Sequence, residues 1–133
     1  MTDLVVDYTL VREIEVIEQF TGPADETVEP GQYARLAPAT GKLTKGNATT
    51  ADEVGSSGGL CITRQVNTIT ILKQGILWLG DGVLDALDFG ATIFLSDTDG
   101  ALADAAGTVS KSLGTVVPLY GHSPFKRGLR LHL

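Results

Sequence analysis

The chain has 133 residues, which is enough for one domain that buries a core of its own. Its hydrophobic content of 43% and mean hydropathy of +0.15 are high for a soluble protein, but no stretch approaches the roughly 20 apolar residues that cross a bilayer. The net charge of −6 disfavours nucleic-acid binding, and the N-terminus lacks the basic flank of a signal peptide. We therefore expect a protein that stays in a cytosol-like compartment, where the single Cys61 forms no intramolecular disulfide.

Charge is distributed unevenly along the chain. Residues 1–31 contain eight acidic residues against the single base Arg12, whereas the residues after Asp104 contain no acid and four bases. This pattern fits a solvated acidic face with a basic tail. It fits equally well two ends of opposite charge that pair between copies or meet a complementary partner.

Residues 1–11 are apolar and β-prone, with no turn that ties them to the rest of the chain. We expect them to form an N-terminal arm that is mobile in the free protein and gains order by adding a strand or an apolar patch to a partner. The alternative is that they form the first strand of a barrel. The candidate partner-binding residues of the arm are Leu4, Val5, Val6, Tyr8, Leu10 and Val11.

A faint internal repeat relates residues 30–44 to residues 89–103 at a constant offset of 59. The matched residues, in order, are Gly31, Leu36, Gly41 and Leu43, against Gly90, Leu95, Gly100 and Leu102. Each copy has the pattern of a strand, a turn that ends on a glycine with positive φ, and a returning strand. The repeat predicts two related hairpins, with Gly41 and Gly100 as equivalent structural turn positions.

The rest of the chain also favours an all-β fold. Strands are expected at residues 12–20, across the apolar region 60–79 with an interruption or bulge at Gly75, at 108–119 and at 129–133. Residues 45–59 are rich in Gly, Ser and Thr and predict an exposed loop, and residues 83–87 could form one helical turn. Together these elements predict residues 12–133 as a single small β-tulip or barrel-like domain.

No catalytic or metal-binding pattern stands out in the sequence. Asp97 to Gly100 begins like a calcium loop, but Thr108 stands where the closing Glu would be, so a hairpin turn is the better interpretation. Gly121 to Pro124 lacks the final glycine of a nucleophile elbow, and neither His122 nor His132 has a second ligand at metal-binding spacing. We therefore expect no enzymatic activity, no cofactor and no metal.

Three segments resemble the head decoration, or capsid cement, proteins of tailed bacteriophages. They are Ile71 to Leu79, Leu87 to Gly100 with its apolar strand and Asp-Gly turn, and Gly107 to Val117 with its Leu-Gly-Thr-Val-Val strand. The resemblance covers about residues 20–120. It implies a β-tulip domain, a homotrimer, and a place on the capsid surface of the virion after synthesis in the host cytoplasm. It also implies that the protein bridges neighbouring subunits of the major capsid protein, with the N-terminal arm reaching onto the shell.

Two other functions fit the same composition. A tail-tube or connector subunit would also be a phage β protein, but it would need longer hairpin arms that join copies into rings. A small ligand-binding barrel would need polar groups that converge in a cavity, a pattern that the sequence does not display.

Overall fold

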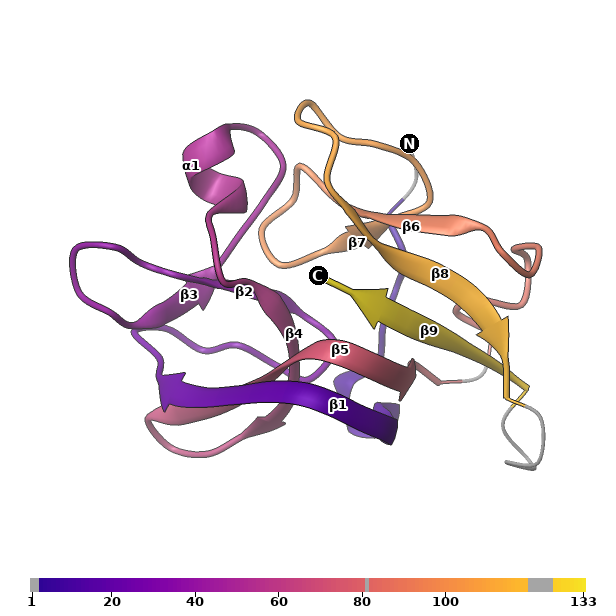
Figure 1. Ribbon diagram of the computed structural model, residues 1–133, viewed down its shortest axis with the longest axis horizontal. Coiled ribbons are helices and arrows are strands. Elements are labelled where there is room, and N and C mark those ends of the chain that lie inside the picture. Colours follow the sequence, from indigo (N-terminus) through magenta and orange to yellow (C-terminus); the bar gives the residue numbers. More distant parts are fainter. Residues whose placement is uncertain (1–2, 81, 120–125) are drawn as a thin grey trace.

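The computed structural model describes residues 3–80, 82–119 and 126–133, and it is an all-β domain whose antiparallel sheet curls into a half-barrel (Figure 1). Nine strands and two short helices follow one another along the described chain. In order they are η1 (Tyr8–Leu10), β1 (Arg12–Pro23), β2 (Tyr33–Leu36), β3 (Leu43–Lys45), α1 (Ala51–Val54), β4 (Gly59–Arg64), β5 (Thr68–Trp78), β6 (Thr92–Leu95), β7 (Leu102–Ala103), β8 (Ser112–Pro118) and β9 (Arg127–His132). The expected all-β fold is confirmed.

The order of strands in the sheet is a palindrome. Eight strands follow the path β3-β2-β4-β5-β9-β8-β6-β7, and β1 pairs with β5 outside this path. When β2, β3, β4 and β5 are replaced by β6, β7, β8 and β9, the order reads the same from the other end. The fold is therefore two four-strand units joined through β5 and β9, as Figure 1 shows with β4 and β5 on one side and β8 and β9 on the other.

The pairing register confirms the predicted duplication and extends it beyond the hairpins. Leu36 faces Leu43 in the first hairpin, and their counterparts Leu95 and Leu102 face each other in the second. The other ladders match in the same way. The pair Ala34–Gly59 in the first unit corresponds to Ile93–Gly114 in the second. The pairs Leu60–Leu72 and Cys61–Ile71 correspond to Thr115–Arg130 and Val116–Leu129. Gly41 and Gly100 have φ of +70° and +71°, as two equivalent turns require.

The two units share their topology but bury different faces. In the first unit Tyr33, Leu60 and Leu72 are buried in the larger core. The equivalent positions of the second unit are Thr92, Thr115 and Arg130, none of which is buried. The second unit instead contributes its opposite face to that core, through residues such as Ile93, Val116 and Leu129.

A smaller core lies on the other face of the first unit. It consists of Val28, Ala34, Leu43, Cys61, Ile69 and Ile71. The first unit is thus covered on both faces, which explains why its strands are apolar at consecutive positions.

Three expectations need correction or refinement. Residues 83–87 form turns and bends rather than a helical turn, and the short helix α1 lies inside the expected loop 45–59, where Thr50 caps it by accepting from the Glu53 N–H at 3.2 Å. The strand expected at 108–119 begins later, at Ser112. The apolar region 60–79 forms two strands, and the second of them runs unbroken through Gly75, which has φ of +149°.

Candidate interaction surface

The N-terminal segment is fastened to the second unit at its start. The Leu4 N–H donates to the Leu102 carbonyl at 2.8 Å, and Asp3 forms a β-bridge with Ala103. The Asp3 carboxylate also accepts a hydrogen bond from the hydroxyl of Ser96, which is fully buried. These contacts cover the outer edge of β7.

The same edge is covered in the first unit by a different part of the chain. The Asp25 N–H donates to the Leu43 carbonyl at 3.1 Å, and Leu43 is the counterpart of Leu102. Residues 3–4 and 24–25 are therefore equivalent, because each pair covers the edge of the second hairpin strand in its unit. Each closes the edge of a short hairpin strand that would otherwise offer unpaired backbone groups to a neighbouring chain.

The structure divides the six predicted arm residues into two groups. Val11 is buried, and Leu4 and Val6 pack against the larger core. In contrast, Val5, Tyr8 and Leu10 are 88%, 50% and 40% exposed. The segment follows the surface of the domain instead of extending from it as an arm, and it forms a short helical turn rather than a regular strand. Its binding to a partner stays a prediction, which now applies to the three exposed side chains.

The turn at Tyr8–Leu10 is fixed by Asp7. Its carboxylate accepts from the Thr9 N–H at 3.0 Å and from the Thr9 hydroxyl at 2.7 Å. These two hydrogen bonds hold the pKa of Asp7 below its ordinary value. The turn presents Tyr8 and Leu10 to solvent immediately before β1 begins.

Strand β1 is the most exposed part of the sheet. It pairs with β5 alone, and its far edge has no strand partner among residues 3–80, 82–119 and 126–133. Val16, Ile17 and Phe20 project from it and are 40%, 62% and 44% exposed. We did not predict these three residues as site residues. The available signal was the mixture of Glu and β-branched residues at 13–18, which is typical of a strand with one side in water.

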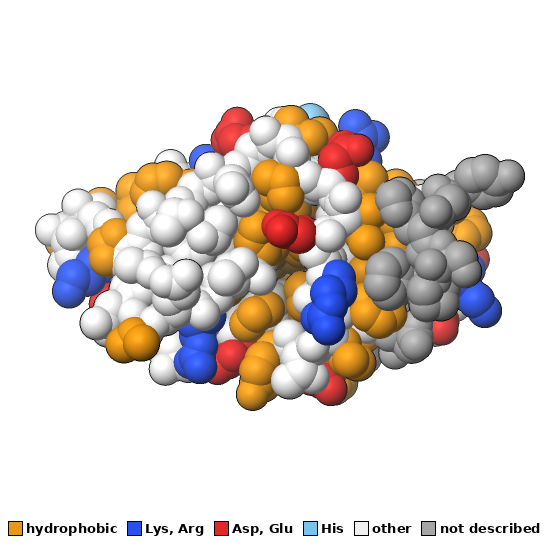
Figure 2. Space-filling model, turned by 90° about the horizontal axis from the view of Figure 1, so that it is seen from below, with side chains coloured by type: hydrophobic (Ala, Val, Ile, Leu, Met, Phe, Trp, Pro, Cys, Tyr) orange, Lys and Arg blue, Asp and Glu red, His pale blue; other side chains and the backbone are white. Residues whose placement is uncertain are grey.

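Charged side chains separate the apolar ones on this surface. Glu13, Glu15 and Glu18 are exposed on β1, and Glu18 lies 3.9 Å from the Lys73 ammonium group. Figure 2 shows one face of the domain on which hydrophobic patches alternate with acidic and basic side chains around a central hollow. An open edge with exposed apolar residues between charges suits a reversible protein contact, because the charges limit nonspecific aggregation.

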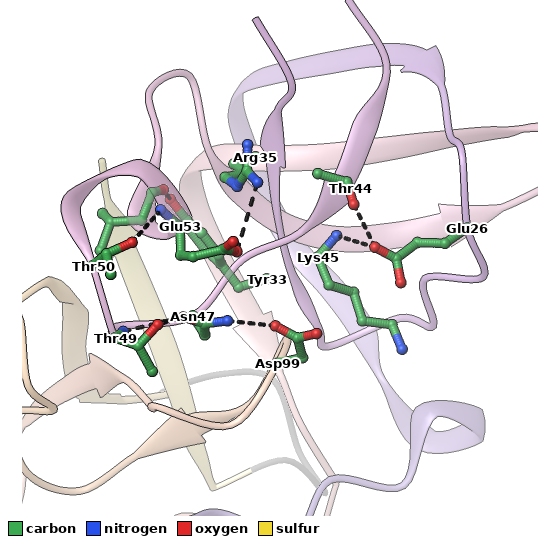
Figure 3. A network of polar contacts seen from close by, with 11 residues as sticks. Glu26, Tyr33, Arg35, Thr44, Lys45, Asn47, Thr49, Thr50, Glu53 and Asp99 are labelled. Carbon is green, nitrogen blue, oxygen red and sulfur yellow. Dashed lines mark hydrogen bonds and ion pairs between the residues drawn. The ribbon is translucent and has the colours of Figure 1, made fainter. Parts of the chain in front are cut away.

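A polar network joins the two hairpins on the other side of the first unit (Figure 3). The Asn47 amide donates to Asp99 at 2.6 Å, and the Glu26 carboxylate accepts from the Lys45 N–H at 3.0 Å and from the Thr44 hydroxyl. The Tyr33 hydroxyl donates to the Val54 carbonyl at 2.8 Å, and burial raises the pKa of Tyr33 to about 12. Each of these groups has a structural partner, so the network positions α1 and the turns.

Two of the residues considered for catalysis or metal binding, Asp97 and Cys61, have structural roles. Asp97 accepts from the Thr108 N–H at 2.8 Å and from its hydroxyl at 2.7 Å, which lowers the pKa of Asp97. Cys61 is buried, and desolvation raises the pKa of its thiol to about 12. Among the described residues no group of three His, Cys, Asp or Glu side chains could hold a metal ion. His122 and Ser123 lie outside these residues.

Comparisons with protein-family models, with curated proteins and with solved structures gave no match. Within the described residues, no helix is long and apolar enough to cross a membrane.

Proposed function

We propose that this protein is a structural component of a bacteriophage virion that binds the outside of the capsid. In this role it stabilises the shell by bridging subunits of the major capsid protein. The observation that carries the proposal is the exposed apolar edge formed by β1 and the segment before it. Val5, Tyr8, Leu10, Val16, Ile17 and Phe20 make up this surface, which we call the β1 surface.

The form of the β1 surface supports a macromolecular partner. Six large hydrophobic side chains are exposed on one continuous stretch of chain, and no other strand of the described residues pairs with the far edge of β1. A neighbouring protein can satisfy both by adding a strand and burying alternate side chains. The body behind this surface is held by two cores and by covered edges at β3 and β7, so it can transmit load between the subunits it joins.

Several copies on one shell would strengthen a weak contact. When copies are linked, binding of one raises the effective concentration of the next. A modest affinity at each β1 surface therefore gives a high overall affinity without any further contact. The resemblance to cement proteins extends the proposal to three copies as a homotrimer at sites of local three-fold symmetry.

The open edge of β1 also supports a second candidate function. In a tail-tube or connector subunit, the same edge would join copies of this chain into rings. Electron microscopy separates the two proposals, because a ring-forming subunit assembles without capsids, whereas a decoration protein appears only as projections on the shell.

The direct test is co-sedimentation with expanded capsids built from the major capsid protein of the virus that encodes this chain. Ile17→Asp and Tyr8→Asp are expected to weaken binding about tenfold or more, since each places a charge in an apolar contact. Val66→Asp is the matched control, because Val66 is 95% exposed on the turn between β4 and β5. Binding that is equal for all variants would refute the role of the β1 surface.

Removing residues 2–10 is a less selective test than these substitutions. The deletion would also remove Leu4 and Val6 from the core and the Asp3 contact with Ser96. We therefore expect the deletion to lower the melting temperature, whereas Tyr8→Asp leaves it within a few degrees of the parent.

A further inference from the structure

A row of side chains crosses one face of the sheet from β1 to β6, and it runs from an acidic residue through an apolar one to a basic one and then to two threonines. Five residues pair in succession across the sheet: Glu15, Ile76, Arg130, Thr115 and Thr92. Residues that pair across neighbouring strands point to the same face. One face therefore carries a carboxylate on β1, an apolar side chain on β5 and a guanidinium on β9.

The part of this row from Arg130 to Thr92 lies in a shallow groove. The groove has a volume of about 260 Å³ and is lined by Thr92, Ser112, Gly114, Thr115, Arg130 and His132. Its lining offers a guanidinium, an imidazole and three hydroxyls, all of which can donate hydrogen bonds. No carboxylate lines it, and Arg130 is exposed and forms no ion pair with the described residues. The groove is therefore suited to a carboxylate supplied from outside the chain.

This face is polar in the second unit, whereas the equivalent face of the first unit is apolar and buried. The positions equivalent to Thr92, Thr115 and Arg130 in the first unit are Tyr33, Leu60 and Leu72, which are fully or almost fully buried. In the second unit the same three positions hold two hydroxyls and a cation that face solvent. Packing inside one copy does not require polar residues there, so this face is free to serve a contact between molecules.

We propose that this face binds the same face of a second copy of the chain, in a symmetric pair with its two-fold axis parallel to β5. Reversing the order of acid, apolar residue and base gives base, apolar residue and acid, so the row is complementary to itself. Glu15 of each copy then meets Arg130 of the other and enters its groove, while the two Ile76 side chains meet at the axis. Two sheets packed face to face lie about 10 Å apart, a distance that these side chains can bridge.

This contact differs from the β1 surface in the residues it uses. The carboxylate of Glu15 and the face of β9 form it, whereas Ile17 and Tyr8 belong to the proposed capsid contact. It predicts a dimer of the free protein in solution, whereas the homotrimer proposed above applies to copies on the capsid. Because its test involves no capsid, a failure of the dimer and a failure of the capsid proposal are separate results.

Sedimentation equilibrium of the purified chain, over protein concentrations up to about 1 mM, measures the association directly. We expect a monomer–dimer equilibrium. Glu15→Arg and Arg130→Glu should each raise the dissociation constant about tenfold or more, since each replaces two attractive pairs by two repulsive ones. The double variant Glu15→Arg/Arg130→Glu should restore the parent value to within about threefold, because it exchanges the two charges and keeps the row complementary to itself.

Glu13→Arg is the matched control, because Glu13 lies on the same strand but pairs with the buried Leu77 instead of Ile76. It should leave the dissociation constant within about threefold of the parent. Circular dichroism spectra that superimpose for all variants establish that each is folded. The proposal would be overturned by a monomer at every concentration or by a trimer. It would also be overturned by a dimer whose dissociation constant is unchanged in both Glu15→Arg and Arg130→Glu.

Discussion

Gly59 and Gly114 occupy the same position in the two four-strand units, and each lies against a backbone carbonyl of the next strand. A Cβ atom at Gly59 would collide with the Leu72 carbonyl oxygen, and one at Gly114 would collide with that of Arg130. Leu72 and Arg130 are themselves equivalent residues. The duplication therefore preserves a close approach of two strands at a site where only glycine fits.

We expect Gly114→Ala to lower the free energy of unfolding by about 3 kcal/mol or more, because the backbone of β9 must move to admit a methyl group. Urea unfolding measures this loss. Gly59→Ala should have an effect of the same kind. A loss below about 1 kcal/mol at both positions would show that the strands separate easily.

Gly41→Ala and Gly100→Ala test the two equivalent turns. We expect each to cost about 1 kcal/mol, since both glycines have φ near +70°. Nothing described lies within 4 Å of a Cβ at Gly41, so the loss there would be purely conformational. A Cβ at Gly100 would also lie 3.3 Å from the side chains of Gln32 and Lys45. Asn tolerates positive φ better than Ala does, so Gly41→Asn serves as the control and should recover part of the loss in a urea melt.

Stability should fall at alkaline pH because two buried groups resist ionisation. Burial raises the pKa of Cys61 from 9.0 to about 12 and that of Tyr33 from 10.0 to about 12. The unfolded chain therefore releases these protons first, and the free energy of unfolding declines from about pH 9 toward pH 12.

Cys61→Ala separates the two contributions. Compared with the parent, the variant should show a shallower decline between about pH 9 and pH 10, where the thiol of the unfolded chain ionises to a greater extent than the Tyr33 hydroxyl. Chemical unfolding at a series of pH values gives the slopes. Identical slopes for the parent and Cys61→Ala would mean that the thiol ionises equally well in the folded protein.

Divalent metal and reductant should leave stability unchanged. The Asp97 carboxylate is occupied by Thr108, and the only cysteine is buried in the smaller core. Thermal melts with and without chelator, and with and without reductant, are expected to superimpose. A drop of several degrees with chelator would indicate a metal site that the hairpin interpretation of Asp97 to Gly100 overlooks.

The sequence predicts the hairpins well because their signals are local. Gly41 and Gly100 stand at turns that require positive φ, and the leucines on either side alternate as strands do. The palindromic order of the strands could not be predicted, because it depends on the pairing of β5 with β9 across about 55 residues of chain. Periodicity gives no information on which distant strands meet.

The residues of the β1 surface were predicted only in part, for a related reason. Residues 1–11 have one composition throughout, but Leu4 and Val6 face the core while Val5 faces solvent. Which side is covered depends on β7, a strand nearly 100 residues away. Val16 and Ile17 resemble core residues in sequence, and they are exposed because β1 lies at the margin of the sheet.

The pairing of β1 with β5 alone also affects how the chain is made. During synthesis, at about 5–20 residues per second, β1 leaves the ribosome before β5, its partner among the described strands, exists. The whole first hairpin and β4 must follow before β5 is available. Throughout that interval a strand with Val16, Ile17 and Phe20 is open to other nascent chains. Because of Glu13, Glu15 and Glu18, β1 is negatively charged in every nascent chain. Identical nascent chains therefore repel one another until β5 emerges.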